Sequence, residues 1–166
     1  MMSFTCRRCG KCCRDLLLRD HGILRGLTLL PEETKHFPEE QVKPYLGLGK
    51  RPYDTNFTVL AYQLTSNVCP HLEDDKCTIY KDRPSTCRQF PFSLDPNKEE
   101  EMLLGVDMNA PAAVELVNTS EGLIEFPDRD SAMRLYELKK QAVENPRRIW
   151  VYDLDKDNWI RYDRLG

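Results

Sequence analysis

The clearest patterns of apolar and polar residues along the chain predict one strand, one helix and one hairpin. Residues 57–65, FTVLAYQLT, are rich in β-branched and aromatic residues and predict a strand. Residues 130–145 predict a helix that stops at an Asn-Pro pair, because apolar residues recur along one face: Ala132, Leu135, Leu138 and Ala142. Two short apolar strands at 149–153 and 159–163 flank the polar turn DKDN and predict a β-hairpin.

Weaker patterns predict shorter elements and one long loop. Residues 30–37 predict a short helix, with a proline and two glutamates in its first turn. Residues 83–90 predict a helical turn between two prolines, and residues 77–80 and 102–107 predict strands. Residues 42–54 contain two prolines and two glycines and predict a loop.

Together these elements predict an α+β fold in a single small domain that spans residues 1–166. Its C-terminal part, residues 130–163, would be a helix followed by a β-hairpin. A chain of this length buries roughly 70% of its unfolded surface on folding, so it does not need disulfide bonds to hold a hydrophobic core.

The composition argues against several classes of protein. The formal net charge of −3 gives no sign of the basic face that nucleic-acid binding needs. No stretch reaches the roughly 18 apolar residues of a membrane span, and the first ten residues lack the apolar core of a signal peptide. We therefore expect a cytoplasmic protein with no nucleic-acid partner and no membrane partner.

The seven cysteines fall into two groups that are far apart in the sequence, at residues 6–13 and 69–87. In a reducing cytoplasm, clustered cysteines are more often metal ligands or redox groups than structural disulfides. An odd number of cysteines also cannot pair completely. We therefore predict a fold organised around a cysteine-rich metal site, with these candidate ligands: Cys6, Cys9, Cys12, Cys13, Cys69, Cys77 and Cys87.

The number of cysteines leaves the form of the metal centre open. Zinc and iron–sulfur centres both take thiolate ligands, commonly four. Seven thiols fit a mononuclear site with three to spare, a multinuclear site with bridging sulfurs, or a cluster with further thiols nearby. Cys13 ranks below Cys12 for a mononuclear site, because consecutive side chains point in different directions. A thiol redox protein built on this adjacent pair is a further alternative.

The two cysteine segments resemble the family of zinc- or iron-chelating domains of the CxxCxxCC type. The resemblance rests on CRRCGKCC at 6–13 and, more specifically, on CPHLEDDKCTIYKDRPSTCRQFPF at 69–92. It implies that all seven cysteines are ligands and that a further set of residues frames them: Tyr80, Arg83, Pro84, Arg88, Phe90 and Pro91. Similar cysteine motifs occur in flagellin lysine methylases.

Two arginines of the second segment, Arg83 and Arg88, flank Cys87. Cations beside a thiolate centre offset its negative charge, so we expect one of these arginines to donate to a thiolate.

Other motifs carry less weight. The alternating aspartates at 153–157 follow the spacing of a calcium loop, but Asn158 and Arg164 stand where that loop needs glycine and glutamate. We interpret them as a hairpin turn. The chain has no nucleophile elbow, zinc-protease motif or phosphate-binding loop, so enzymatic activity stays undecided.

These observations predict a metal-ion binding protein that holds zinc or iron through clustered thiolates and has a structural or accessory role. Its partners would be the metal ion and another protein. The alternative is an iron–sulfur cluster protein that acts in electron transfer or protein modification, as the methylase motifs suggest.

Overall fold

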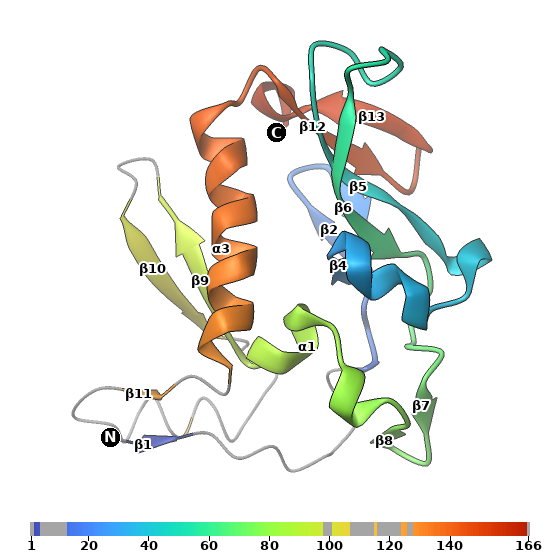
Figure 1. Cartoon of the computed structure of the whole chain (residues 1–166), viewed down its shortest axis with the longest axis vertical. Coiled ribbons are helices and arrows are strands. Elements are labelled where there is room, and N and C mark those ends of the chain that lie inside the picture. The colour runs from blue at the N-terminus through green and yellow to red at the C-terminus, as the bar shows by residue number, and fades with distance from the viewer. Residues whose placement is uncertain are drawn as a thin grey trace. The chain divides into compact units, whose positions relative to one another are not determined.

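The computed structural model describes residues 2–3, 13–97, 101–106, 115, 124–125 and 128–165. Helices and strands are mixed in this part of the chain, so the fold is α+β, as the sequence predicts (Figure 1). The chain divides into two compact units, which we describe separately. Unit 1 comprises Met1–Cys13 and His71–Lys140, and unit 2 comprises Arg14–Pro70 and Gln141–Gly166.

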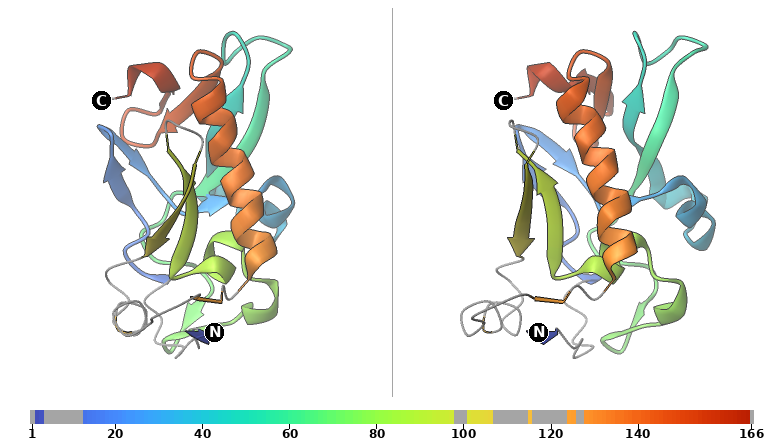
Figure 2. Two further views of the ribbon diagram at one scale, coloured as in Figure 1. Left: turned by 90° about the vertical axis from the view of Figure 1, so that its left-hand side faces the viewer. Right: turned by 60° about the vertical axis from the view of Figure 1, so that its left-hand side comes forward.

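Unit 2 is built on a five-stranded antiparallel sheet with the strand order β13-β12-β5-β6-β4 (Figures 1 and 2). Its strands, in chain order, are β4 (Thr28–Leu29), β5 (Val42–Leu48), β6 (Thr58–Leu64), β12 (Ile149–Asp153) and β13 (Asn158–Arg161). Strand β6 lies where the sequence predicts a strand. The two C-terminal strands are not a free-standing hairpin, because β12 also pairs with β5.

The loop predicted at 42–54 is wrong over its first half, because β5 occupies Val42–Leu48 at the centre of the sheet. Pro44 is tolerated beside an irregularity, since the register between β5 and β6 shifts between Pro44 and Leu46. Gly47 leaves room for the Phe57 ring, because a Cβ atom there would lie 2.1 Å from it and the ring would have to shift. The residues that suggested a loop therefore adapt a central strand to its neighbours.

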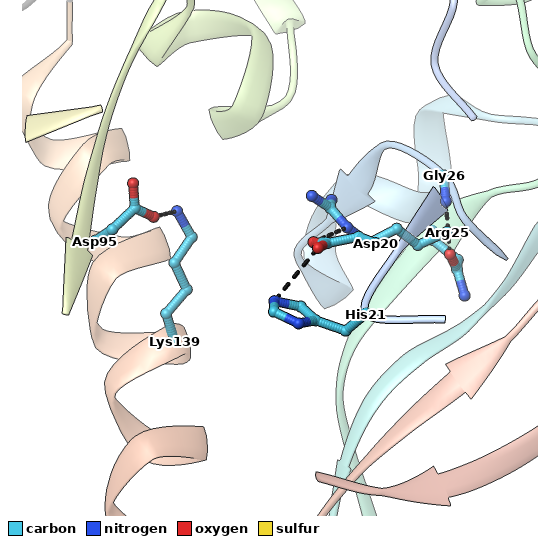
Figure 3. Close-up of polar contacts among 7 residues, drawn as sticks. Asp20, His21, Arg25, Gly26, Asp95 and Lys139 are labelled. Atoms are coloured by element: carbon cyan, nitrogen blue, oxygen red, sulfur yellow. Dashed lines mark hydrogen bonds and ion pairs between the residues drawn. The ribbon is translucent and has the colours of Figure 1, made fainter. Parts of the chain in front are cut away.

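One buried glutamine joins three segments of unit 2. The Gln63 side chain is 0% exposed. Its Oε1 accepts a hydrogen bond from the Gly26 backbone N–H at 2.8 Å, and its Nε2 donates to the carbonyls of Pro44 at 2.9 Å and Tyr152 at 3.2 Å. Gly26 is labelled in Figure 3, and a Cβ atom there would lie 1.8 Å from the Leu64 carbonyl oxygen. The close approach of two backbones thus explains this glycine.

A small hairpin, β2 (Leu18–Asp20) and β3 (Ile23–Arg25), adds to unit 2. Its turn residues His21 and Gly22 have φ values of 50° and 83°, which suit a tight two-residue connection. The Arg25 guanidinium lies 3.2 Å from the Asp20 carboxylate, as Figure 3 shows. The hairpin is held to β12, because the Leu24 N–H donates to Asp153 Oδ1 at 3.0 Å.

Short 3₁₀ helices complete unit 2: η2 (Pro31–His36), η3 (Glu39–Gln41) and η5 (Tyr162–Arg164). The first corresponds to the helix predicted at 30–37. Its start is capped by the Glu33 carboxylate, which accepts from the Leu30 N–H at 2.8 Å.

The described residues of unit 1 form two hairpins and two α-helices. The hairpins are β7 (Leu72–Glu73) with β8 (Lys76–Cys77), and β9 (Phe92–Pro96) with β10 (Met102–Val106). A 3₁₀ turn, η4 (Tyr80–Asp82), leads into helix α1 (Ser85–Gln89), and β1 (Met2–Ser3) pairs in parallel with β11 (Ile124–Glu125). The long helix α3 (Arg129–Glu144) lies mostly in unit 1.

Helix α3 packs against the β9–β10 hairpin. Leu94 of β9 forms an apolar cluster with Ala132 and Tyr136 of the helix. Beside this cluster, Lys139 Nζ lies 2.5 Å from Asp95 Oδ1, as Figure 3 shows. The apolar stripe that predicted the helix is therefore buried, whereas the charged Lys139 binds Asp95 of the hairpin. No helix in the described part of the chain combines the length and apolar character needed to cross a membrane.

The aspartates of the β12–β13 turn are all engaged by neighbouring groups of the protein. Asp153 Oδ1 accepts from the backbone N–H of Asp155 at 3.0 Å, and the Asp155 carboxylate lies 3.1 Å from Arg19 Nη2. Asp157 accepts from Lys43 Nζ at 2.5 Å and from the Tyr152 hydroxyl. These contacts agree with a hairpin turn rather than a calcium loop.

We expect Asp157→Asn to lower the pKa of Tyr152. Burial and the hydrogen bond to the Asp157 carboxylate raise the pKa of this phenol to about 12. Removing the negative charge brings it back toward 10. Subtracting the ultraviolet pH titration of Tyr152→Phe from that of the parent isolates this one tyrosine. Because the folded pKa is the raised one, its contribution to stability is full below pH 10 and is lost as pH rises toward 12.

The matched control for this titration is Asp155→Asn, which removes a carboxylate of the same turn that binds Arg19 instead. It should leave the Tyr152 midpoint in place. Equal midpoints for Asp157→Asn and the parent would show that this carboxylate does not act on Tyr152.

Candidate metal centre

Four of the seven candidate ligands lie among the described residues. Cys13, Cys69 and Cys87 are buried, with exposed fractions of 4%, 7% and 9%, and Cys77 is half-buried. Cys13, Cys77 and Cys87 belong to unit 1 and Cys69 belongs to unit 2. The other three predicted ligands, Cys6, Cys9 and Cys12, lie outside the described residues.

Cys77 is held by the short β7–β8 hairpin. It is the last residue of β8 and pairs with Leu72. The next residue closes the base of the hairpin, because both the N–H and the hydroxyl of Thr78 donate to the His71 carbonyl, at 2.9 and 3.0 Å. The exposed turn residues Asp74 and Asp75 have φ values of 49° and 63°. The acidic EDDK stretch thus forms a tight surface turn, which fixes the backbone at Cys77.

Cys87 lies in the middle of helix α1 and is held by its first turn. Pro84 precedes the helix, and its carbonyl accepts from the N–H of Cys87 at 2.9 Å and from that of Arg88 at 3.0 Å. A proline suits this N-cap position, because no hydrogen bond within the helix needs an N–H there. The helical turn predicted at 83–90 therefore exists, and it presents Cys87 from a buried position.

The two arginines beside Cys87 brace the backbone of the segment that carries it. Arg88 donates from Nε to the Arg83 carbonyl and from Nη2 to the Lys81 carbonyl, both at 2.8 Å. Arg83 donates from Nε to the Tyr80 carbonyl at 3.0 Å, and its guanidinium stacks on the Tyr80 ring at 3.9 Å from the ring centre. Their charges stay close to Cys87 in sequence, but these contacts give them a structural role that the sequence does not predict.

Asp128 also contributes to this region, and the sequence analysis did not identify it. Its Oδ1 accepts from the Ser131 N–H at 3.0 Å at the start of α3, and its Oδ2 lies 3.8 Å from Arg88 Nη1. It therefore caps the long helix and also faces the arginine that braces the Cys87 segment. An aspartate just before a helical pattern is a cap signal, so the first of these roles could have been found.

The chemistry of the donor set suits zinc or iron. Thiolates are soft ligands that both metals accept, and buried positions on short fixed elements keep water away from bound metal. Within the described residues, no three His, Cys, Asp or Glu side chains form a group that could hold a metal ion. For the four described cysteines, the structure therefore shows which element carries each residue and how buried it is, but not a complete set of metal ligands.

The comparisons with known proteins agree with the cysteine pattern. A family model described as "CxxCxxCC: Putative zinc- or iron-chelating domain" matches residues 5–109, which is more than half of the chain. The match includes both cysteine groups and the β9–β10 hairpin. No match was found among curated proteins or among solved structures.

Proposed function

Because the chain belongs to this CxxCxxCC family of zinc- or iron-chelating domains, we propose that it binds zinc or iron through cysteine thiolates. The observation that carries the proposal is the family match over residues 5–109, which spans both cysteine groups. Burial of three of the four described cysteines supports it, since thiols kept from solvent on short fixed elements suit a closed thiolate centre. The ligands would be drawn from Cys6, Cys9, Cys12, Cys13, Cys69, Cys77 and Cys87.

The role we propose is structural or accessory to another protein, with the ligand segments 6–13 and 69–92 serving one domain. A bound zinc ion would cross-link these segments, whereas an iron–sulfur cluster would add electron transfer. The cluster is the second candidate, because it also commonly takes four thiolates, which the seven thiols of the chain can supply.

Elemental analysis of protein purified without oxygen tests the proposal and separates its two forms. A colourless sample with stoichiometric zinc supports the first form, and a brown sample with iron, sulfide and broad visible absorption supports the second. Metal-free protein in which all seven cysteines react freely with a thiol reagent would contradict both.

Variants link the metal to the cysteines. We expect Cys69→Ala and Cys87→Ala to lower the ratio of metal to protein, because each removes a thiolate donor. Thr86→Ala is the matched control, since it changes the residue next to Cys87 on the same helix and removes no sulfur. Metal content that is equal in all three variants and the parent would remove these two cysteines from the ligand set.

A further inference from the structure

Three segments rich in basic residues lie at one end of the five-stranded sheet of unit 2. Since neighbouring strands are antiparallel, β5 and β13 end where β12 begins. Figure 1 shows the three segments that follow or precede these strand ends, residues 49–57, 145–148 and 161–164, at the upper end of the sheet. They carry six cations, which we call the basic patch: Lys50, Arg51, Arg147, Arg148, Arg161 and Arg164.

Hydrogen bonds to backbone carbonyls hold the three segments together. The Gly49 N–H donates to the Arg148 carbonyl at 2.9 Å, and Trp150 Nε1 donates to the Gly49 carbonyl at 3.1 Å. The Asp163 N–H donates to the Pro146 carbonyl at 3.0 Å. The basic side chains therefore project from a fixed scaffold and not from separate flexible loops.

The positive charge of the patch is largely uncompensated. Its segments contain two acidic residues, Asp54 and Asp163. Asp163 accepts from Arg161 Nε at 2.7 Å; this bond, with the charges of Arg164 and Arg147, lowers its pKa. Among the described residues, Arg161 is the one member of the patch that forms an ion pair with a carboxylate. The other five members form no ion pair with a described carboxylate: Lys50, Arg51, Arg147, Arg148 and Arg164. Because the whole chain has a net charge of −3, this charge is segregated to one place.

The loop that carries Lys50 and Arg51 also carries one exposed aromatic ring. Tyr53 is 89% exposed and stands two residues after Arg51 in the same loop. The other large apolar side chains that are exposed in the described part of the chain lie outside these three segments: Leu18, Val68, Met102, Leu103 and Leu104. The patch thus lacks the apolar side chains that insert into a lipid surface, but it offers a ring on which a planar group can stack.

We propose that the basic patch binds single-stranded nucleic acid, with its arginines on phosphates and Tyr53 stacked on a base. Five of its six cations are arginines, whose planar guanidinium groups bind phosphate through paired hydrogen bonds. An exposed aromatic ring beside such cations is the combination that binds unpaired bases. The expectation of no nucleic-acid partner rested on the net charge of the whole chain, which does not report a local group of cations. The proposal does not depend on the metal centre.

The test uses the whole 166-residue chain as purified, and fluorescence polarisation of labelled oligothymidylate and oligouridylate of about 15 nucleotides. We expect binding whose affinity falls with salt at a log–log slope of about −3.5, as about five phosphate contacts at ~0.7 each require. Arg147→Glu combined with Arg148→Glu should weaken binding about tenfold or more. Tyr53→Ala should weaken it about tenfold without changing the salt slope.

The matched control is Lys35→Glu combined with Lys156→Glu, which reverses two exposed cations of unit 2 outside the patch and changes net charge equally. It should bind like the parent, and equal loss in both double variants would overturn the proposal. So would a polyglutamate peptide or anionic vesicles that bind more tightly than the oligonucleotides. Circular dichroism verifies folding, and Arg147→Gln and Arg148→Gln replace the double variant if it misfolds.

Discussion

Removing the metal from the purified protein should unfold at least the segments that carry the cysteines. A structural zinc ion in a small peptide contributes an apparent ~10–16 kcal/mol at neutral pH. A whole domain is stable by only ~5–15 kcal/mol. The bound metal would therefore account for most or all of the net stability of these segments. Thermal melting followed by circular dichroism, with and without a strong chelator, measures the effect.

Amide hydrogen exchange locates the unfolding that chelation causes. We expect protection to fall first in the β7–β8 hairpin and in α1, which hold Cys77 and Cys87 through few backbone hydrogen bonds. The five-stranded sheet of unit 2 has its own buried core, with Leu29, Leu64 and Ile149 fully buried, and should lose protection later.

The control for the chelator is the same reagent already saturated with zinc, which cannot extract metal but has every other effect. It should leave the melting curve unchanged. If protein shown to be metal-free melts like the untreated sample, the metal does not stabilise the fold, and the proposed structural role fails.

Strong periodicity made part of the fold predictable. Residues 57–65 and the stripe along 130–145 predicted β6 and α3, because in both segments the pattern follows the burial. Ala132, Leu135 and Ala142 of that stripe are 0%, 3% and 4% exposed. A regular pattern of apolar residues reflects one continuous buried face, and such a face is visible in the sequence without knowledge of what covers it.

The strand at Val42–Leu48 could not be predicted in the same way. Pro44 and Gly47 normally interrupt regular structure, and here each is explained by a neighbour distant in sequence. The proline stands beside a shift in register against β6, and the glycine leaves room for the Phe57 ring. Both depend on tertiary contacts, which cannot be read from the local sequence. The same holds for the pairing of β12 with β5, which joins strands about a hundred residues apart.

The sequence also predicted the turns that carry Cys77 and Cys87 better than it predicted the hydrogen bonds around them. The helical turn at Cys87 and the acidic turn before Cys77 follow from prolines and aspartates in sequence. The sequence placed Arg83 and Arg88 next to Cys87 but did not show that they donate to the carbonyls of Tyr80, Lys81 and Arg83. That an arginine lies close to a cysteine in sequence can be read from the sequence. The groups to which its guanidinium donates depend on the fold. The assignment of all seven cysteines as ligands stays a prediction.

Gln63→Leu should lower the free energy of unfolding of unit 2 by about 3 kcal/mol or more. Leucine has nearly the same size but cannot hydrogen-bond, so the substitution removes the side-chain partner of the buried Gly26 N–H and of the part-buried carbonyls of Pro44 and Tyr152. Each such group costs ~1–3 kcal/mol. Urea unfolding followed by the fluorescence of Trp150 and Trp159, both in the sheet, measures the change.

The control Gln141→Leu makes the same chemical change in helix α3, at a residue that is partly exposed. Its side chain has solvent as an alternative partner, so the cost should stay within ~0.5 kcal/mol. The comparison isolates burial as the cause, because amide loss and leucine gain are common to both variants. Equal unfolding free energies for Gln63→Leu and the parent would mean that water replaces the lost amide. The segments of Gly26, Pro44 and Tyr152 would then be held by the strand ladder alone.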